Sequence, residues 1–157
     1  MKRPWNLPNI PVYSLATYDG EKVNMNICTY VSAVSMKPKR YMVAVYHETQ
    51  SLQNILLSQT AILQVLGKQH VSLVNVLGKR SGLRYDKESY LIKRKHIELW
   101  NDRKVLSQCA GLVELEKLWS KDAGDHVLFL FDVKRFQTNH ENVLMLDDLR
   151  EKKLVRI

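Results

Sequence analysis

The order of short extended runs and tight-turn signals constrains the fold of this chain more than any other feature. Residues 10–18 and 22–29 are rich in β-branched and aromatic side chains, and Asp19-Gly20 between them is a typical hairpin turn. Further extended runs occupy residues 41–46, 61–66, 111–121 and 127–133. Residues 122–125 have the composition of a turn between the last two runs. A chain with about five or six short strands buries its apolar side chains most simply in a small closed or partly closed barrel.

Short helical segments are expected between the strands. Thr49 or Ser51 can cap a helix that begins after the 41–46 run. The apolar residues of that helix are spaced to share one face: Leu52, Ile55 and Leu56. Residues 70–77 have room for one or two further helical turns. The sequence therefore predicts an all-β fold with short helices.

The length of 157 residues suits one domain over 1–157, and a 45% hydrophobic content is enough for a packed core. No apolar run approaches the ~20 residues that cross a bilayer, and the charged N-terminus lacks the apolar stretch of a signal peptide. Cys28 and Cys109 are too far apart for a CxxC motif, so we expect free or buried thiols in a reducing compartment. These features predict a cytoplasmic protein without a membrane partner.

The sequence lacks the short motifs of several enzyme classes. It contains no GxxxxGK[ST] phosphate loop, no GxGxxG motif, no HExxH motif and no GxSxG motif. None of the five histidines stands at metal-ligand spacing from another histidine or from a cysteine, so we expect no metal site.

Three motifs follow one another along the chain. Residues 23–38 combine two Asn residues, a run of small or hydroxyl side chains and a Val-Ser pair shortly before a Pro. Residues 43–55 place an extended run before a Thr-Gln-Ser helix start, and residues 123–129 open the last extended run with Gly-Asp-His. In this order the motifs resemble the flavin reductase-like, FMN-binding split-barrel family. The resemblance covers roughly residues 8–136 and leaves 137–157 as a C-terminal extension of the same domain.

The resemblance implies an FMN-binding split β-barrel that works as an NAD(P)H-dependent flavin reductase, with FAD as the alternative flavin. It also implies a homodimer in which each flavin lies near the subunit interface. Several residues match the family's flavin-contacting segments: Asn24, Asn26, Thr29, Tyr30, Val31, Tyr46, His47, Ser51 and Gln64. His126, from the Gly-Asp-His motif, is the candidate catalytic residue.

Physical chemistry assigns a task to two of these residues. A helix that begins near Thr49 offers unpaired N–H groups to a phosphate, and Ser51 in its first turn adds a hydroxyl donor. The alternative is that both residues only cap the helix. His126 opens a strand after a Gly-Asp turn, which places it at the barrel rim. There it can donate a hydrogen bond to a flavin or nicotinamide oxygen, or hold its own turn together with Asp125.

Two other functions stay open at this stage. Phe131 stands where family members often have Gly, and a ring there would narrow the space for a nicotinamide. This departure favours a flavin-binding electron carrier without nicotinamide activity. The net charge of +8 and four tyrosines that could stack on bases, Tyr13, Tyr18, Tyr30 and Tyr46, are also compatible with a small nucleic-acid-binding barrel, the less favoured interpretation.

Overall fold

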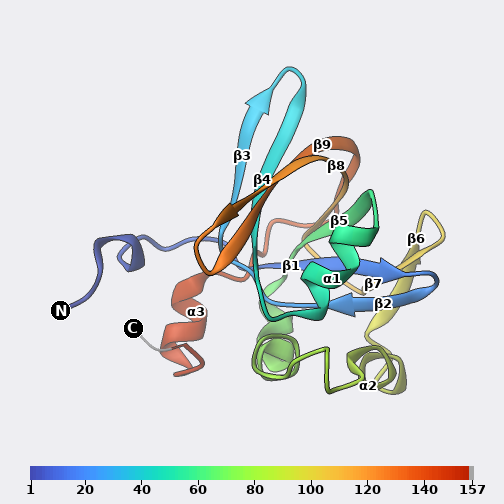
Figure 1. Cartoon of the computed structure of the whole chain (residues 1–157). Coiled ribbons are helices and arrows are strands. Elements are labelled where there is room, and N and C mark those ends of the chain that lie inside the picture. Colours follow the sequence, from blue (N-terminus) through green and yellow to red (C-terminus); the bar gives the residue numbers. More distant parts are fainter. Residues whose placement is uncertain (156–157) are drawn as a thin grey trace.

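The computed structural model describes residues 1–155, and within them seven strands form one antiparallel sheet in the order β2-β1-β5-β8-β9-β4-β3 (Figure 1). These strands are β1 (Tyr13–Asp19), β2 (Lys22–Met25), β3 (Val31–Met36), β4 (Lys39–Tyr46), β5 (Thr60–Val65), β8 (Gly111–Ala123) and β9 (His126–Thr138). A separate two-stranded ribbon contains β6 (Ile97–Trp100) and β7 (Arg103–Leu106). The extended runs predicted from the sequence are all strands.

The sheet curls into a barrel because one short segment links strands from its two ends. Tyr13, at the start of β1, exchanges both backbone hydrogen bonds with Cys28, at N···O distances of 2.9 and 2.8 Å. Two residues later, the carbonyl of Tyr30 accepts from the Ala44 N–H of β4 at 3.0 Å. Residues 28–30 thus bridge β1 and β4. The predicted split β-barrel is confirmed.

The two tight hairpins predicted from turn chemistry, β1–β2 and β8–β9, both form. Asp19 pairs with Lys22 across a two-residue turn, and Gly20 adopts the left-handed φ of +59° that this turn requires. The β8–β9 hairpin turns at Gly124, with φ +83°, and Asp125. This turn is shorter than the predicted 122–125, because Ala123 still pairs with His126.

Helix α1 (Gln50–Leu57) begins at the predicted cap. The Thr49 hydroxyl oxygen accepts from the Leu52 N–H at 3.1 Å, which satisfies one orphan donor of the first turn. Of the three residues predicted to share one face, Leu52 and Ile55 are buried, whereas Leu56 lies at the edge of that face and is about half exposed. The other helices are η1 (Pro4–Asn6), η2 (Lys68–Leu73), η3 (Asn75–Lys79), α2 (Lys87–Lys93) and α3 (Leu146–Glu151). η2 and η3 confirm the helical turns predicted for 70–77.

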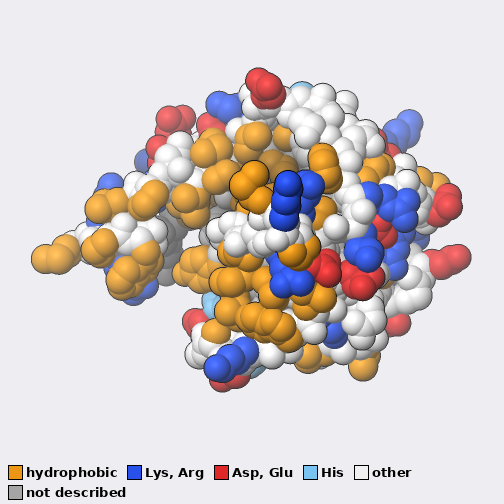
Figure 2. Space-filling view, turned by 90° about the horizontal axis from the view of Figure 1, so that it is seen from above, with side chains coloured by type: hydrophobic (Ala, Val, Ile, Leu, Met, Phe, Trp, Pro, Cys, Tyr) orange, Lys and Arg blue, Asp and Glu red, His pale blue; other side chains and the backbone are white. Residues whose placement is uncertain are grey.

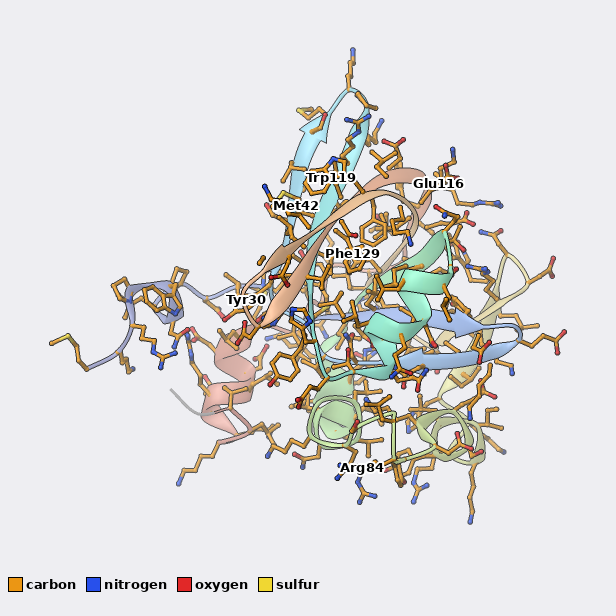
Figure 3. The ribbon with its side chains drawn as sticks, viewed as in Figure 1. Tyr30, Met42, Arg84, Glu116, Trp119 and Phe129 are labelled. Atoms are coloured by element: carbon orange, nitrogen blue, oxygen red, sulfur yellow. The ribbon has the colours of Figure 1, made fainter. Side chains whose placement is uncertain are left out.

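The barrel interior is filled by apolar side chains from its strands. Phe129 of β9 lies there (Figure 3) and is fully buried, as is Phe131, and their rings stack with centroids 5.8 Å apart. Phe131 therefore belongs to the packed core. The expectation that its ring would narrow a ligand space was wrong, because residues 129 and 131 share the inward face of the strand.

Residues 137–151 pack onto the barrel as part of the same domain. β9 continues to Thr138, and the Leu144 backbone bonds to Val12 and Leu66 at 2.9 and 2.8 Å. α3 follows directly after this contact and covers one end of the sheet (Figure 1). Among residues 1–155, no helix combines the length and the apolar character needed to span a membrane.

Candidate functional site

A cavity of about 390 Å³ lies between the start of α1, the segment after β2 and the loop after η3. The cavity lining includes seven residues predicted from the sequence: Asn24, Asn26, Thr29, Tyr30, Tyr46, Ser51 and His126. They come from four separate parts of the chain. The volume is within the range of about 300–1,000 Å³ that is typical of small-molecule sites.

Thr49 and Ser51, at the start of α1, have different roles: one caps the helix and the other can bind a ligand. Thr49 caps the helix and also donates to the Tyr46 carbonyl at 2.8 Å, so both functions of its hydroxyl are used within the fold. Ser51 is fully buried, and its Oγ accepts from the Asn24 amide at 3.1 Å. Among residues 1–155, no acceptor pairs with the Ser51 hydroxyl hydrogen. Ser51 can therefore donate to a ligand, whereas Thr49 is the cap.

Three rings form the aromatic rim of the cavity. The His126 ring lies 5.1 Å from the Tyr30 ring and 5.5 Å from the Tyr46 ring, measured between centroids. Tyr30 lies beside the turn of the β8–β9 hairpin (Figure 3). The Asp125 carboxylate bonds to Nδ1 of His126 at 2.6 Å, and this hydrogen bond lowers the pKa of that carboxyl. Asp125 thus orients the imidazole and leaves Nε2 to meet a ligand, so both predicted tasks of His126 are compatible.

Sequence reasoning missed the basic wall of the cavity. Lys79 and Arg80 line it from the loop after η3, and the Arg80 guanidinium lies 4.4 Å from the centroid of the Tyr85 ring. Lys87, the first residue of α2, also lines the cavity although it is only 5% exposed. Its Nζ donates to the carbonyls of Met25 and Leu77 at 3.0 and 2.8 Å. Burial lowers the pKa of Lys87 to about 8.

Three predicted residues lie outside the cavity lining. Val31 starts β3 and packs against the barrel core. His47 bonds through Nε2 to Asp122 at 2.8 Å, on the outer side of the β8–β9 hairpin. Gln64 is fully buried, donates to Ser14 Oγ at 3.2 Å and accepts from the Leu106 N–H at 2.7 Å. Gln64 is thus used inside the fold and His47 in an exposed pair, and neither lines the cavity with the other seven.

In the part of the chain that the structure describes, no three His, Cys, Asp or Glu side chains come together as metal ligands do. Cys28 and Cys109 form no disulfide.

Residues 9–152 match the flavin reductase like domain. The chain belongs to this family. The match extends past residue 136, where the motifs in the sequence end, and includes α3. No curated protein sequence matches this chain.

Solved structures with this fold resemble the chain over most of its length. The FMN-binding protein of Thermus thermophilus, solved with bound 1-cyclohex-2-enone, has a TM-score of 0.76 at 19% identity, covering 88% of this chain and 75% of its own. Flavoredoxin from Methanosarcina acetivorans has a TM-score of 0.75 at 16% identity, covering 92% and 77%. The NADH:FAD oxidoreductase of Streptomyces globisporus has a TM-score of 0.75 at 14% identity, covering 87% and 80%. At these identities the likeness describes the fold.

Proposed function

We propose that this flavin reductase-like domain binds FMN in the site cavity and reduces it with NAD(P)H. The observation that carries the proposal is the combination of an anion-binding end with an aromatic rim in one cavity. The start of α1, Ser51 and three basic side chains line the cavity, and so does the cluster of the Tyr30, Tyr46 and His126 rings. A flavin nucleotide has the matching chemistry, with an anionic phosphate and a flat aromatic ring.

The residues present fit such a ligand. The unpaired N–H groups at the start of α1 favour an anion, and the Ser51 hydroxyl hydrogen is free among residues 1–155 to join them. Lys79, Arg80 and Lys87 add positive charge, while the acidic lining residue, Glu48, is exposed. Asn26 accepts from the Leu15 N–H through Oδ1, which leaves its amide hydrogens for ring heteroatoms.

FMN, when bound, would supply the hydride acceptor. The protein groups would hold the ring, exclude water and orient the nicotinamide, and hydride transfer itself needs no general base. His126 donates Nδ1–H to Asp125, so in its imidazolium form it would also donate from Nε2 to an oxygen of one of the two rings, whereas in its neutral form Nε2 would be an acceptor. FAD is the alternative flavin, and mass spectrometry of the flavin released on denaturation identifies which one is bound.

We also propose that the active form is a homodimer, as the family resemblance implies. Three neighbouring strands place partly or largely exposed apolar residues side by side on the outer face of the barrel. Leu130 of β9 pairs with Met42 of β4 on one side and with Trp119 of β8 on the other. The edge strand β3 adds exposed Val34 and Met36. Hydrophobic side chains also gather on the face seen from above in Figure 2. Light scattering after gel filtration should give twice the monomer mass, and a monomeric Trp119→Lys variant would place the interface here.

An anaerobic absorbance experiment tests the reductase proposal. The purified protein should be yellow, and mixing with NADH or NADPH should bleach the visible flavin band within seconds. A yellow protein whose oxidised spectrum persists with both nucleotides would instead be an electron carrier. A colourless protein that takes up no added FMN would refute flavin binding, and retardation of oligonucleotides would then favour the nucleic-acid-binding alternative. The cytoplasmic location stays a prediction.

A further inference from the structure

Lys87 is unusual because its amine is buried without a carboxylate partner. The residue is 5% exposed, and no Asp or Glu among residues 1–155 lies within ion-pair distance of its Nζ. Lysines are almost never fully buried unless they are paired, because removing the charge from water is costly. The flanking acids serve other groups. Asp86 caps α2 through Ser89, and Glu88 bonds to Val23 N–H and pairs with Lys104.

The amine has one donor more than the fold uses. An ammonium carries three N–H donors, and the carbonyls of Met25 and Leu77 accept from two of them. Lys87 also lines the site cavity. The third donor therefore has no protein acceptor among the described residues, in a lysine that contributes to the cavity wall.

The surroundings of the amine favour an anion. Ser51 and Asn24, which line the same cavity, are buried and bonded to each other at 3.1 Å. Lys79 and Arg80 line it as well, whereas Glu48 is exposed. A buried ammonium and a buried hydroxyl that each keep a free hydrogen are suited to a phosphate group, whose oxygens accept several hydrogen bonds.

We propose that Lys87 supplies the buried countercharge for the phosphate of the flavin nucleotide, donating its third N–H to a phosphate oxygen. This inference rests on the proposed FMN binding and deepens it. The amine also joins the end of β2 to the carbonyl at Leu77, before the loop with Lys79 and Arg80. Lys87 thus makes the site selective for phosphorylated over unphosphorylated flavin.

The test compares FMN with riboflavin, which lacks the phosphate. Dissociation constants for both are measured by fluorescence titration with the wild type, Lys87→Met and Lys87→Gln. Hydrogen bonds to charged groups predict that FMN affinity falls about tenfold to hundredfold in both variants. Riboflavin affinity should change by less than about threefold. Lys93→Met, an exposed lysine of the same helix outside the cavity lining, is the matched control and should bind both flavins as the wild type does.

Gln keeps an N–H₂ group for the two carbonyls, so Lys87→Gln remains informative if Lys87→Met does not fold. Equal losses of FMN and riboflavin affinity, together with a lower melting temperature, would make Lys87 a structural brace and overturn the inference. Unchanged FMN affinity in a folded variant would overturn it as well, while leaving FMN binding intact. A wild type that binds neither flavin would overturn both this inference and the proposed function.

Discussion

Gly82→Ala is the most discriminating perturbation of the site, because the structure leaves no room for a methyl group there. A Cβ on Gly82 would lie 2.2 Å from Oδ1 of Asn24 and 3.0 Å from Cβ of Gln50. The φ of Gly82 lies outside the left-handed range, so the backbone itself tolerates alanine. The methyl must therefore displace the Asn24 amide, which donates to Ser51 at the cavity wall.

Two effects of the methyl group lower the stability of the folded state, and one effect raises it. Overpacking costs about 1–3 kcal/mol, and leaving a buried amide unsatisfied costs about 1–3 kcal/mol more if the bond to Ser51 breaks fully. Replacing glycine by alanine in a loop stabilises the protein by only about 0.4–1 kcal/mol, because it reduces the conformational entropy of the unfolded chain. We expect a net destabilisation of about 2 kcal/mol, which lowers the melting temperature by about 4–8 °C in a domain of this size. FMN affinity should fall as well, because Ser51 loses its partner.

A double-mutant cycle tests whether Asn24 is the cause. Thermal unfolding and FMN titration are measured for Gly82→Ala in the wild type and in Asn24→Ala. Removing the Asn24 amide removes the closest contact, so the methyl should cost clearly less in the second background. Gly78→Ala is the control, since its nearest neighbour is the Ile27 side chain at 3.2 Å, and its cost should be smaller. Equal costs of Gly82→Ala in both backgrounds, or no cost in either, would refute this reasoning.

The remaining predictions concern three side chains. Ser51→Asp should weaken FMN binding about thirtyfold, since a like charge costs about 2 kcal/mol against the phosphate; unchanged affinity in a titration would place the phosphate elsewhere. His126→Ala should slow flavin reduction in stopped-flow mixing while FMN affinity and melting temperature barely move, and a melting temperature that drops first would assign it to the turn. His70 accepts from Gly67 N–H and bonds to the Ser107 carbonyl, and burial lowers its pKa below the ordinary 6.5. The unfolded state then binds the proton more readily, so stability should fall as the pH drops below about 6.5, and urea titrations of His70→Gln should show a flatter pH dependence.

Local turn and cap chemistry explains why much of the fold could be predicted. Asp19-Gly20 and Gly124-Asp125 specify their hairpins because a glycine takes the left-handed conformation in each. Thr49 specifies the start of α1 through its own hydroxyl. These turn and cap interactions involve residues only a few positions apart, so the sequence alone is enough to predict them.

Two strand regions without a regular apolar alternation escaped prediction. β3 lies at the sheet edge with most of its residues exposed, so it shows no clear apolar alternation. The β6–β7 ribbon turns at Asn101 and Asp102, both with positive φ, and its strands mix apolar and charged residues without a regular alternation. In both cases tertiary pairing, rather than local pattern, makes the strand.

The same distinction applies to the site: residues next to a turn or a helix cap could be predicted, whereas residues placed by contacts with distant parts of the chain could not. Thr49, Ser51 and His126 stand beside turn or cap signals, and the structure puts Ser51 and His126 in one cavity with the residues after β2. Lys87 was missed because a lysine after Asp86 has the pattern of a solvated helix start, whereas contacts with the distant Met25 and with Leu77 hold its amine inside the fold. Gln64 shows the opposite case, a polar strand residue whose amide is used inside the fold.

The position of Phe131 connects the barrel core with access to the cavity. On β9 the side chains of Phe129 and Phe131 point inward, whereas His126, three residues before Phe129, stands at the rim with Tyr30 and Tyr46. A nicotinamide that approaches this cavity would therefore meet the three rim rings and not the phenylalanine. Tyr30 and Tyr46 are 58% and 46% exposed, so their rings can reorient without disturbing the core. The core thus fixes the strand that carries His126, while the three rim rings lie outside the packed core.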